Sequence, residues 1–89
     1  MKAVITVVGK DRTGIIARVS NYLADQGVNI LDISQTIMQE LFTMIMLVDT
    51  QNSEIGIEAL SADLNKIGEE MSLTIHIQHE GLFTSMHRI

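Results

Sequence analysis

The chain contains no cysteine, and aromatic residues make up only 3% of its 89 residues. Without cysteine there is no disulfide framework, no thiolate zinc site and no cysteine nucleophile. Hydrophobic residues nevertheless make up 46% of the chain, which is too large a share for a disordered polypeptide. We therefore expect one folded domain with a core of aliphatic side chains and methionine.

Positive charge is also scarce. Six Lys and Arg residues stand against eleven Asp and Glu residues, and the formal net charge is −5. This balance repels a phosphate backbone, so we expect no nucleic-acid partner. No hydrophobic run reaches the length of a membrane span, and the N-terminus shows no signal-peptide pattern. The composition therefore predicts a cytoplasmic protein without membrane association.

Hydrophobic periodicity predicts six elements in the order strand, helix, strand, strand, helix, strand. Strands are expected over residues 3–8, 28–39, 41–48 and 73–78. One helix follows Thr13 and stops at Gly27, and a second runs from residue 54 to a stop within residues 68–72. Two right-handed crossovers then place both helices on one face of a four-stranded antiparallel sheet. This predicts an α+β fold of the ferredoxin-like βαββαβ type, with a core over about residues 1–79 and a C-terminal tail at residues 80–89.

The same patterns assign residues to faces. Thr13 is the predicted N-cap of the first helix, and Ile16 starts the buried stripe of that helix. Strict alternation along the second strand places Asn29 on the face of Ile33, and Ile30 on the opposite face.

Both faces of the first and third strands are hydrophobic, while the helices cover only one face of the sheet. The bare face then forms a hydrophobic patch, which favours a homodimer or a homotetramer. The alternative is that the tail, with Leu82, Phe83 and Met86, folds back over that face.

The stretch VVGKDRTGII follows the first predicted strand. Gly9 and Gly14 have the spacing of a nucleotide-binding phosphate loop, but Ile15 and Ile16 stand where its Lys and Ser or Thr belong. A nucleotide hydrolase is therefore excluded, and no cofactor is expected. His76 and His79 are three apart on a strand, so they point to opposite faces and do not predict a metal site.

The segment GKDRTGIIARVSNYLADQGVNILDI resembles the opening half of an ACT domain. That family shows D-R-P-G or N-R-P-G, then an aliphatic helix, then G-V-N-I entering the second strand. The resemblance covers nearly the whole chain, so residues 1–89 are interpreted as a single, stand-alone ACT-like domain. The sequence departs from the family at Thr13, where Pro is frequent, and at Gly9, where amino-acid-binding members often carry a polar side chain.

The resemblance implies a regulatory, non-catalytic module that dimerises and senses an amino acid or a similar small metabolite at the subunit interface. Asp11 suits an ammonium group, the amides of Gly14 and Ile15 suit a carboxylate, and Asn29 offers both a donor and an acceptor. This interpretation expects the first loop to lie beside the start of the second strand. The predicted site residues are Asp11, Arg12, Thr13, Gly14, Ile15, Asn29 and Ile30.

Two alternatives remain open from the sequence. The first is a non-catalytic adaptor dimer in which the pocket is vestigial. The second is an enzyme similar to acylphosphatases, which share this order of strands and helices. In that case Arg12 or Arg18 orients a phosphoryl group, and Asn29 positions the attacking water.

Overall fold

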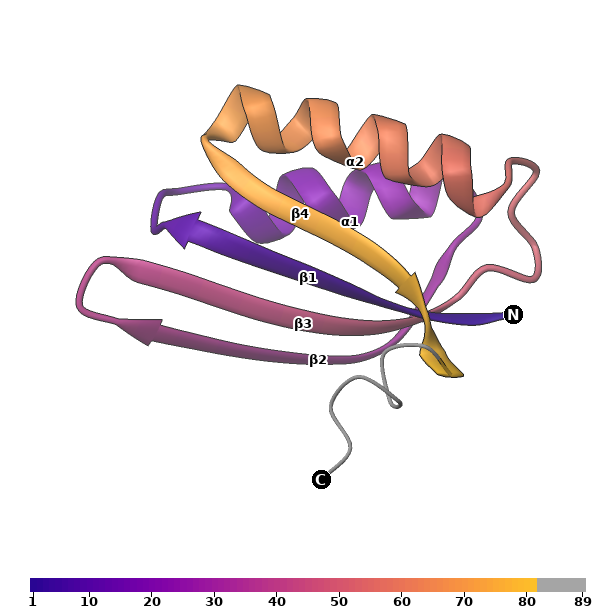
Figure 1. Cartoon of the computed structure of the whole chain (residues 1–89), viewed down its shortest axis with the longest axis horizontal. Coiled ribbons are helices and arrows are strands. Elements are labelled where there is room, and N and C mark those ends of the chain that lie inside the picture. The colour runs from indigo at the N-terminus through magenta and orange to yellow at the C-terminus, as the bar shows by residue number, and fades with distance from the viewer. Residues whose placement is uncertain (82–89) are drawn as a thin grey trace.

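The computed structural model describes residues 1–81, and these contain the six expected elements in the expected order (Figure 1). The strands are β1 (Lys2–Lys10), β2 (Asn29–Met38), β3 (Leu41–Asp49) and β4 (Leu73–His79), and the helices are α1 (Ile15–Asp25) and α2 (Ile57–Met71). The sheet order is β2-β3-β1-β4, and every neighbouring pair is antiparallel. The predicted ferredoxin-like α+β fold is confirmed. The predicted tail residues Leu82, Phe83 and Met86 lie outside the described residues.

Both helices lie on one face of the sheet, and the core fills the space between these two layers (Figure 1). Phe42 is the one aromatic side chain among the buried residues of the described chain, and the two methionines of β3 are fully buried beside it. The core is therefore aliphatic and methionine-rich, as the composition predicts. Its fully buried members include Ala3, Ile5, Val7, Val19, Leu23, Met44, Met46, Val48, Leu60 and Leu64.

The buried faces of the helices differ from the prediction in detail. The stripe of α1 starts at Ile15, which is 2% exposed, whereas Ile16 is 39% exposed. Ile15, Val19 and Leu23 are four residues apart and share one side of the helix. The helix α2 ends at Met71, inside the predicted stop at residues 68–72, and Gly68 is buried within it. The predicted stop at Gly27 is confirmed by its positive φ of 74°.

The strand β2 contains a bulge that simple alternation does not anticipate. Ile30 pairs with Val48 and Asp32 pairs with Leu47, so Leu31 is an extra residue with no partner of its own on β3. Beyond the bulge the faces are reversed. Ile30 lies on the helix side with Ile33, whereas Asn29 lies on the open face with Asp49. The predicted faces of Asn29 and Ile30 relative to Ile33 are therefore wrong.

The two helices leave β2 uncovered at one edge of the sheet (Figure 1). All of its residues except the half-buried Ile30 are exposed. Ile33 and Ile37 face the helix side, yet they remain 40% and 51% exposed. The most exposed hydrophobic side chains on the helix side therefore lie along this edge.

The open face is less continuous in its hydrophobicity than the sequence predicts. Val8, Leu41 and Ile45 are exposed there, but Thr6 and Thr43 lie between them in the same strands. Among residues 1–81, neither helix has the length and hydropathy that crossing a bilayer requires.

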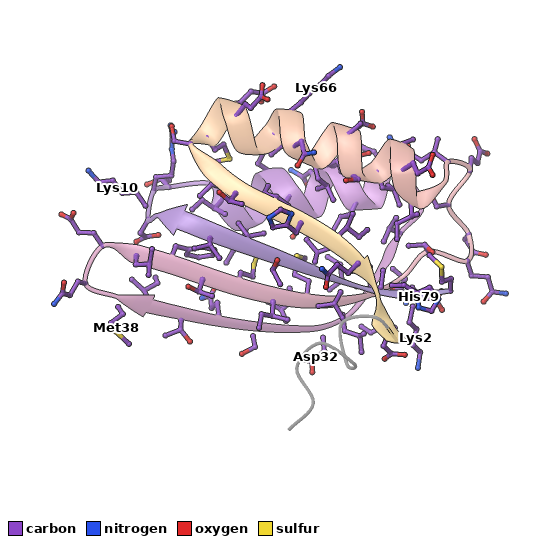
Figure 2. All side chains as sticks on the ribbon, in the orientation of Figure 1. Lys2, Lys10, Asp32, Met38, Lys66 and His79 are labelled. Carbon is purple, nitrogen blue, oxygen red and sulfur yellow. The ribbon has the colours of Figure 1, made fainter. Side chains whose placement is uncertain are left out.

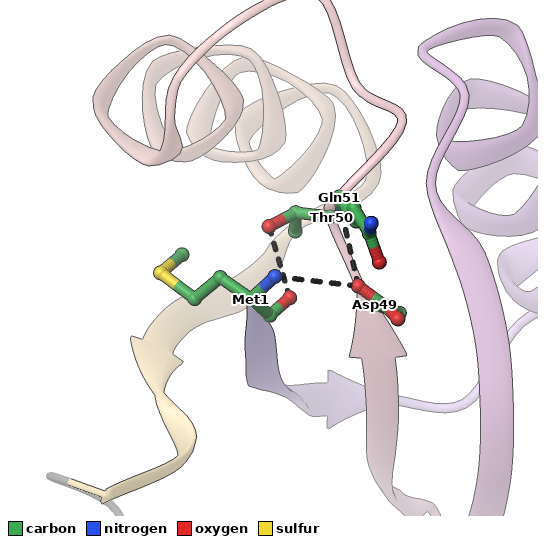
Figure 3. Close-up of polar contacts among 4 residues, drawn as sticks. All are labelled: Met1, Asp49, Thr50 and Gln51. Carbon is green, nitrogen blue, oxygen red and sulfur yellow. Dashed lines mark hydrogen bonds and ion pairs between the residues drawn. The ribbon is translucent and has the colours of Figure 1, made fainter.

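Two sets of polar contacts link the two helices to each other and the N-terminus to the end of β3. The Tyr22 hydroxyl of α1 donates to the Asp63 carboxylate of α2 at 2.6 Å, and burial together with this bond raises the pKa of Tyr22. The Met1 amine pairs with Asp49 at 3.4 Å, and the Met1 carbonyl accepts from the Thr50 hydroxyl at 3.1 Å (Figure 3). The start of β1 is thereby tied to the end of β3.

Gly68 allows α2 to approach the start of β4. A Cβ at this position would lie 2.6 Å from the Leu73 carbonyl oxygen, a backbone atom that cannot rotate away. We expect Gly68→Ala to lower the free energy of unfolding by about 1–3 kcal/mol, as for overpacking elsewhere. The matched control is Gly56→Ala, whose Cβ would meet nothing within 4 Å and should cost less than about 1 kcal/mol. Equal losses in urea unfolding would contradict close packing at Gly68.

Asp49 should make stability depend on acid pH. The Gln51 amide, and after it the Met1 amine, hold the pKa of the Asp49 carboxyl below its usual 3.8, although desolvation opposes them. The folded state therefore binds this proton more weakly than the unfolded chain. The resulting stabilisation is present above the usual pKa and is lost as the pH falls through the lowered one. Urea unfolding over this acid range should show a smaller loss for Asp49→Asn than for the parent, and parallel curves would rule the effect out.

Candidate functional site

The loop between β1 and α1 is fixed at one end of the sheet. The Asp11 amide donates to the Glu40 carbonyl in the β2–β3 hairpin at 2.7 Å. Gly14 then takes a left-handed conformation, with φ of 91°, and is itself the N-cap of α1. No side chain caps this helix, so the prediction that Thr13 is the N-cap is wrong. With Thr13 as the N-cap, the helix would have begun at residue 14. Because Gly14 is the N-cap instead, α1 begins at Ile15.

The uncapped start of α1 leaves backbone donors available. The first amide bonded inside the helix is that of Arg18, which donates to the Gly14 carbonyl at 2.9 Å. The amides of Ile15, Ile16 and Ala17 precede it and have no acceptor within residues 1–81. Amides in the first turn of a helix favour a negatively charged group.

A hollow of about 300 Å³ opens beside this helix start. Its mouth carries Asp11 and Arg12, and neither side chain forms an ion pair or hydrogen bond within the described part of the chain. Its remaining wall is mostly hydrophobic and comes from α1, β2 and β3. The lining residues are Asp11, Arg12, Gly14, Ile15, Ile16, Ala17, Gln35, Ile37 and Phe42.

The structure brings together four of the seven predicted site residues. Asp11, Arg12, Gly14 and Ile15 line the hollow. Thr13 is exposed and does not line it.

Asn29 and Ile30 lie at the opposite end of the sheet from the loop. Lys10 pairs with Leu41, whereas Asn29 pairs with Asp49, which is eight residues further along β3. This places Asn29 roughly 25 Å from the loop. Figure 2 shows the same arrangement, with Lys10 at one end of the sheet and Lys2, which pairs with Asp49, at the other. The expectation that the loop lies beside the start of the second strand is therefore wrong within one chain.

The residues proposed for an acylphosphatase-like reaction are also separated. Arg12 lies at the hollow and Asn29 at the far end of the sheet. Arg18 points to the helical surface, where it pairs with Glu70 at 3.3 Å. A single chain does not assemble the catalytic combination that the sequence suggested.

Sequence reasoning missed the part of the hollow that β2 and β3 supply. Gln35 and Ile37 lie on the helix side of β2, and Phe42 lies opposite Ile37 on β3. The alternation of β2 indicates their shared face. Their position beside the loop follows from the pairing of Lys10 with Leu41, and the Asp11–Glu40 bond adds to it; no local sequence pattern indicates either contact.

Gly9 has a packing role in this chain. A Cβ at this position would lie 2.7 Å from Leu73 Cδ2 and 3.0 Å from the Ser72 carbonyl oxygen. The start of β4 therefore occupies the space that a side chain at position 9 would need. A polar side chain at position 9 therefore has no room to contact a ligand in this chain.

The histidines lie on different faces, as expected. His76 pairs with Thr6 on the open face, and His79 pairs with Ala3 on the helix side. Within residues 1–81, no three histidine or acidic side chains come close enough together to hold a metal ion.

Comparison with known proteins identifies the family. Residues 2–78 match the sequence profile of the ACT domain. A UPF0237 protein of Clostridium acetobutylicum is 54% identical over the full length of both chains. An ACT domain protein from Streptococcus pneumoniae has a TM-score of 0.82 and 42% identity, with 93% of each chain covered. A putative glycine cleavage system transcriptional repressor has a TM-score of 0.73 and 28% identity, over 89% of this chain and 47% of that one. The chain belongs to the ACT domain family.

Proposed function

We propose that the protein is a dimeric regulatory module that binds a free amino acid, or a similar small zwitterion, in the hollow beside the start of α1. The observation that carries this proposal is the pair of unpaired opposite charges, Asp11 and Arg12, at the mouth of that hollow. The carboxylate suits an ammonium group. The guanidinium and the free amides of α1 suit a carboxylate. Membership of the ACT family and the similarity to a putative transcriptional repressor support a regulatory role.

The second copy is proposed to pair with the free edge of β2. This ten-residue strand presents unpaired backbone groups along its outer edge, and such an edge is a template for another strand. Ile33 and Ile37 are exposed on its helix side, and Ile16 of α1 is exposed on the same face of the molecule. A copy of the chain related by a two-fold axis would cover the edge and Ile33, while Ile16 and Ile37 would keep surface open to the hollow that they line.

The bulge selects the register of this pairing. Ten residues of β2 span nine residues of β3, so the strand behaves as nine positions. Full antiparallel overlap then centres on Ser34, which would lie opposite Ser34 of the partner subunit. Each helix-side residue would meet another helix-side residue, as Ile33 would meet Gln35 of the partner subunit. Residues opposite each other in a sheet must share a face, and this register satisfies that requirement.

The same register would complete the site. Asn29 would lie opposite Met38 of the partner subunit, and Ile30 opposite Ile37 of the partner subunit, which lines the hollow. Each hollow would therefore receive Ile30 from the second copy, and Asn29 would end the same strand at the edge of the site, on the open face beside Met38 of the partner subunit. A ligand that contacts both copies stabilises this packing by its differential affinity for it, which is how binding would be signalled.

A cysteine at the proposed two-fold axis tests the register. The chain has no cysteine, so Ser34→Cys introduces a single exposed thiol. Its Cβ should lie about 5 Å from its counterpart, close to disulfide geometry. We expect mild oxidation to give a covalent dimer on a non-reducing gel.

Thr36→Cys is the matched control on the same face of β2. Its two thiols would be roughly 13 Å apart, so it should not cross-link with itself. Mixed with Asp32→Cys, whose position would lie opposite it, it should cross-link. Equal cross-linking of Ser34→Cys and Thr36→Cys, or none at all, would reject this dimer.

Ligand binding is tested by calorimetry and thermal shift with the standard amino acids. A ligand at a hundredfold excess over its Kd should add about 2.7 kcal/mol to the free energy of unfolding. Arg12→Ala and Asn29→Ala change exposed residues, so neither should unfold the protein; Arg12→Ala should abolish binding and Asn29→Ala should weaken it. If no amino acid binds, the adaptor alternative replaces this proposal.

Mixing these two variants shows whether the site is shared between copies. In a mixed dimer, one hollow would combine an intact Arg12 with an intact Asn29 from the other copy, and the second hollow would lack both. Subunit exchange should therefore restore part of the binding that each variant lost. A mixture that remains inactive would place Asn29 outside the site.

A further inference from the structure

Asp11 and Arg12 are the charged residues that line the hollow, whereas the rest of its described lining is mostly hydrophobic. Ile16, Ala17, Ile37 and Phe42 form this hydrophobic wall, and Gln35 is the one uncharged polar side chain that residues 1–81 contribute to the lining. Resting on the proposed function, we infer that the hollow selects amino acids with an aliphatic side chain, such as leucine, isoleucine and valine. The proposed function requires only a zwitterion, so the two can fail separately.

The exposed surface of the wall indicates how much hydrophobic area a bound ligand side chain could remove from water. Phe42 is only 2% exposed, whereas Ile16 and Ile37 are 39% and 51% exposed. An aliphatic side chain laid against these two isoleucines would remove hydrophobic surface from water on both sides of the contact. In the proposed dimer, Ile30 of the partner subunit would close the hollow with a further aliphatic group.

Other side chains fit this wall poorly. A carboxylate or an ammonium group on the ligand side chain would lose water and find no oppositely charged partner beyond the mouth. The side chain of serine would leave the isoleucines uncovered. Gln35 offers one polar contact, which does not replace the hydration of a charge.

The closeness of the two charged residues restricts how a ligand can bind. Asp11 and Arg12 are consecutive residues, and α1 begins three residues after Arg12. The ammonium and the carboxylate of the ligand must therefore be held together while its side chain points along the wall. A compound that lacks either charged group should lose most of its affinity.

Equilibrium dialysis with the full-length protein tests this selectivity. Leucine, isoleucine and valine should each bind at least about tenfold more tightly than serine, aspartate and lysine, which is the usual scale for contacts in a hydrophobic pocket. 4-Methylpentanoate and isopentylamine, which each lack one charge of leucine, should compete weakly. Tighter binding of a polar or charged amino acid overturns the inference and leaves the proposed function intact. Absence of binding by every amino acid overturns both.

Ile37→Ala locates the selectivity in the hollow. Ile37 is half exposed, so the substitution should leave the fold intact. It should weaken leucine binding about tenfold and change alanine binding little. Ile33→Ala is the matched control, because Ile33 lies on the same side of β2, is 40% exposed and does not line the hollow. It should leave the ratio of leucine to alanine affinity unchanged. Equal effects of the two substitutions on that ratio would overturn the inference.

Discussion

The uneven cover of the sheet is the constraint on which the rest of the structure depends. Helices α1 and α2 bury the helix-side residues of β3 and β1, such as Met44 and Val7, but stop short of β2. Ile33 and Ile37 therefore stay exposed beside an unpaired strand edge. The same uncovered edge leaves space beside the start of α1, and that space is the hollow. The candidate site and the candidate interface are thus two consequences of one gap in packing.

Periodicity was sufficient to predict the element order and the aliphatic core, because each buried stripe follows from the local repeat of a helix or strand. The features that it missed depend on pairing with another part of the chain. The bulge at Leu31 exists only relative to β3. Thr13 has the right chemistry for an N-cap, but the left-handed conformation of Gly14 takes that position.

The candidate site divides in the same way. Asp11, Arg12, Gly14 and Ile15 are neighbours in sequence, so a motif places them together. Gln35, Ile37 and Phe42 reach the hollow because β1 pairs with β3 as far as Lys10 and Leu41, which places the loop beside the hairpin, where the Asp11 amide bonds to the Glu40 carbonyl. For Asn29, in contrast, the motif gives the wrong location within one chain. The family resemblance groups it with the loop, but the register of one chain separates the two by most of the sheet.

The bulge would allow a dimer in which the site implied by the family resemblance agrees with the strand register. Without an extra residue, full antiparallel overlap of two ten-residue strands would set Ile33 against Ser34 of the partner subunit, and these residues lie on opposite faces. Opposed residues in a sheet share a face, so such a strand would have to slip by one position and lose part of the overlap. With Leu31 as the unpaired residue, full overlap and matching faces occur together. The same overlap would carry Ile30 to the partner's hollow and Asn29 to the edge beside it, so an irregularity in one strand would determine where the proposed site is completed.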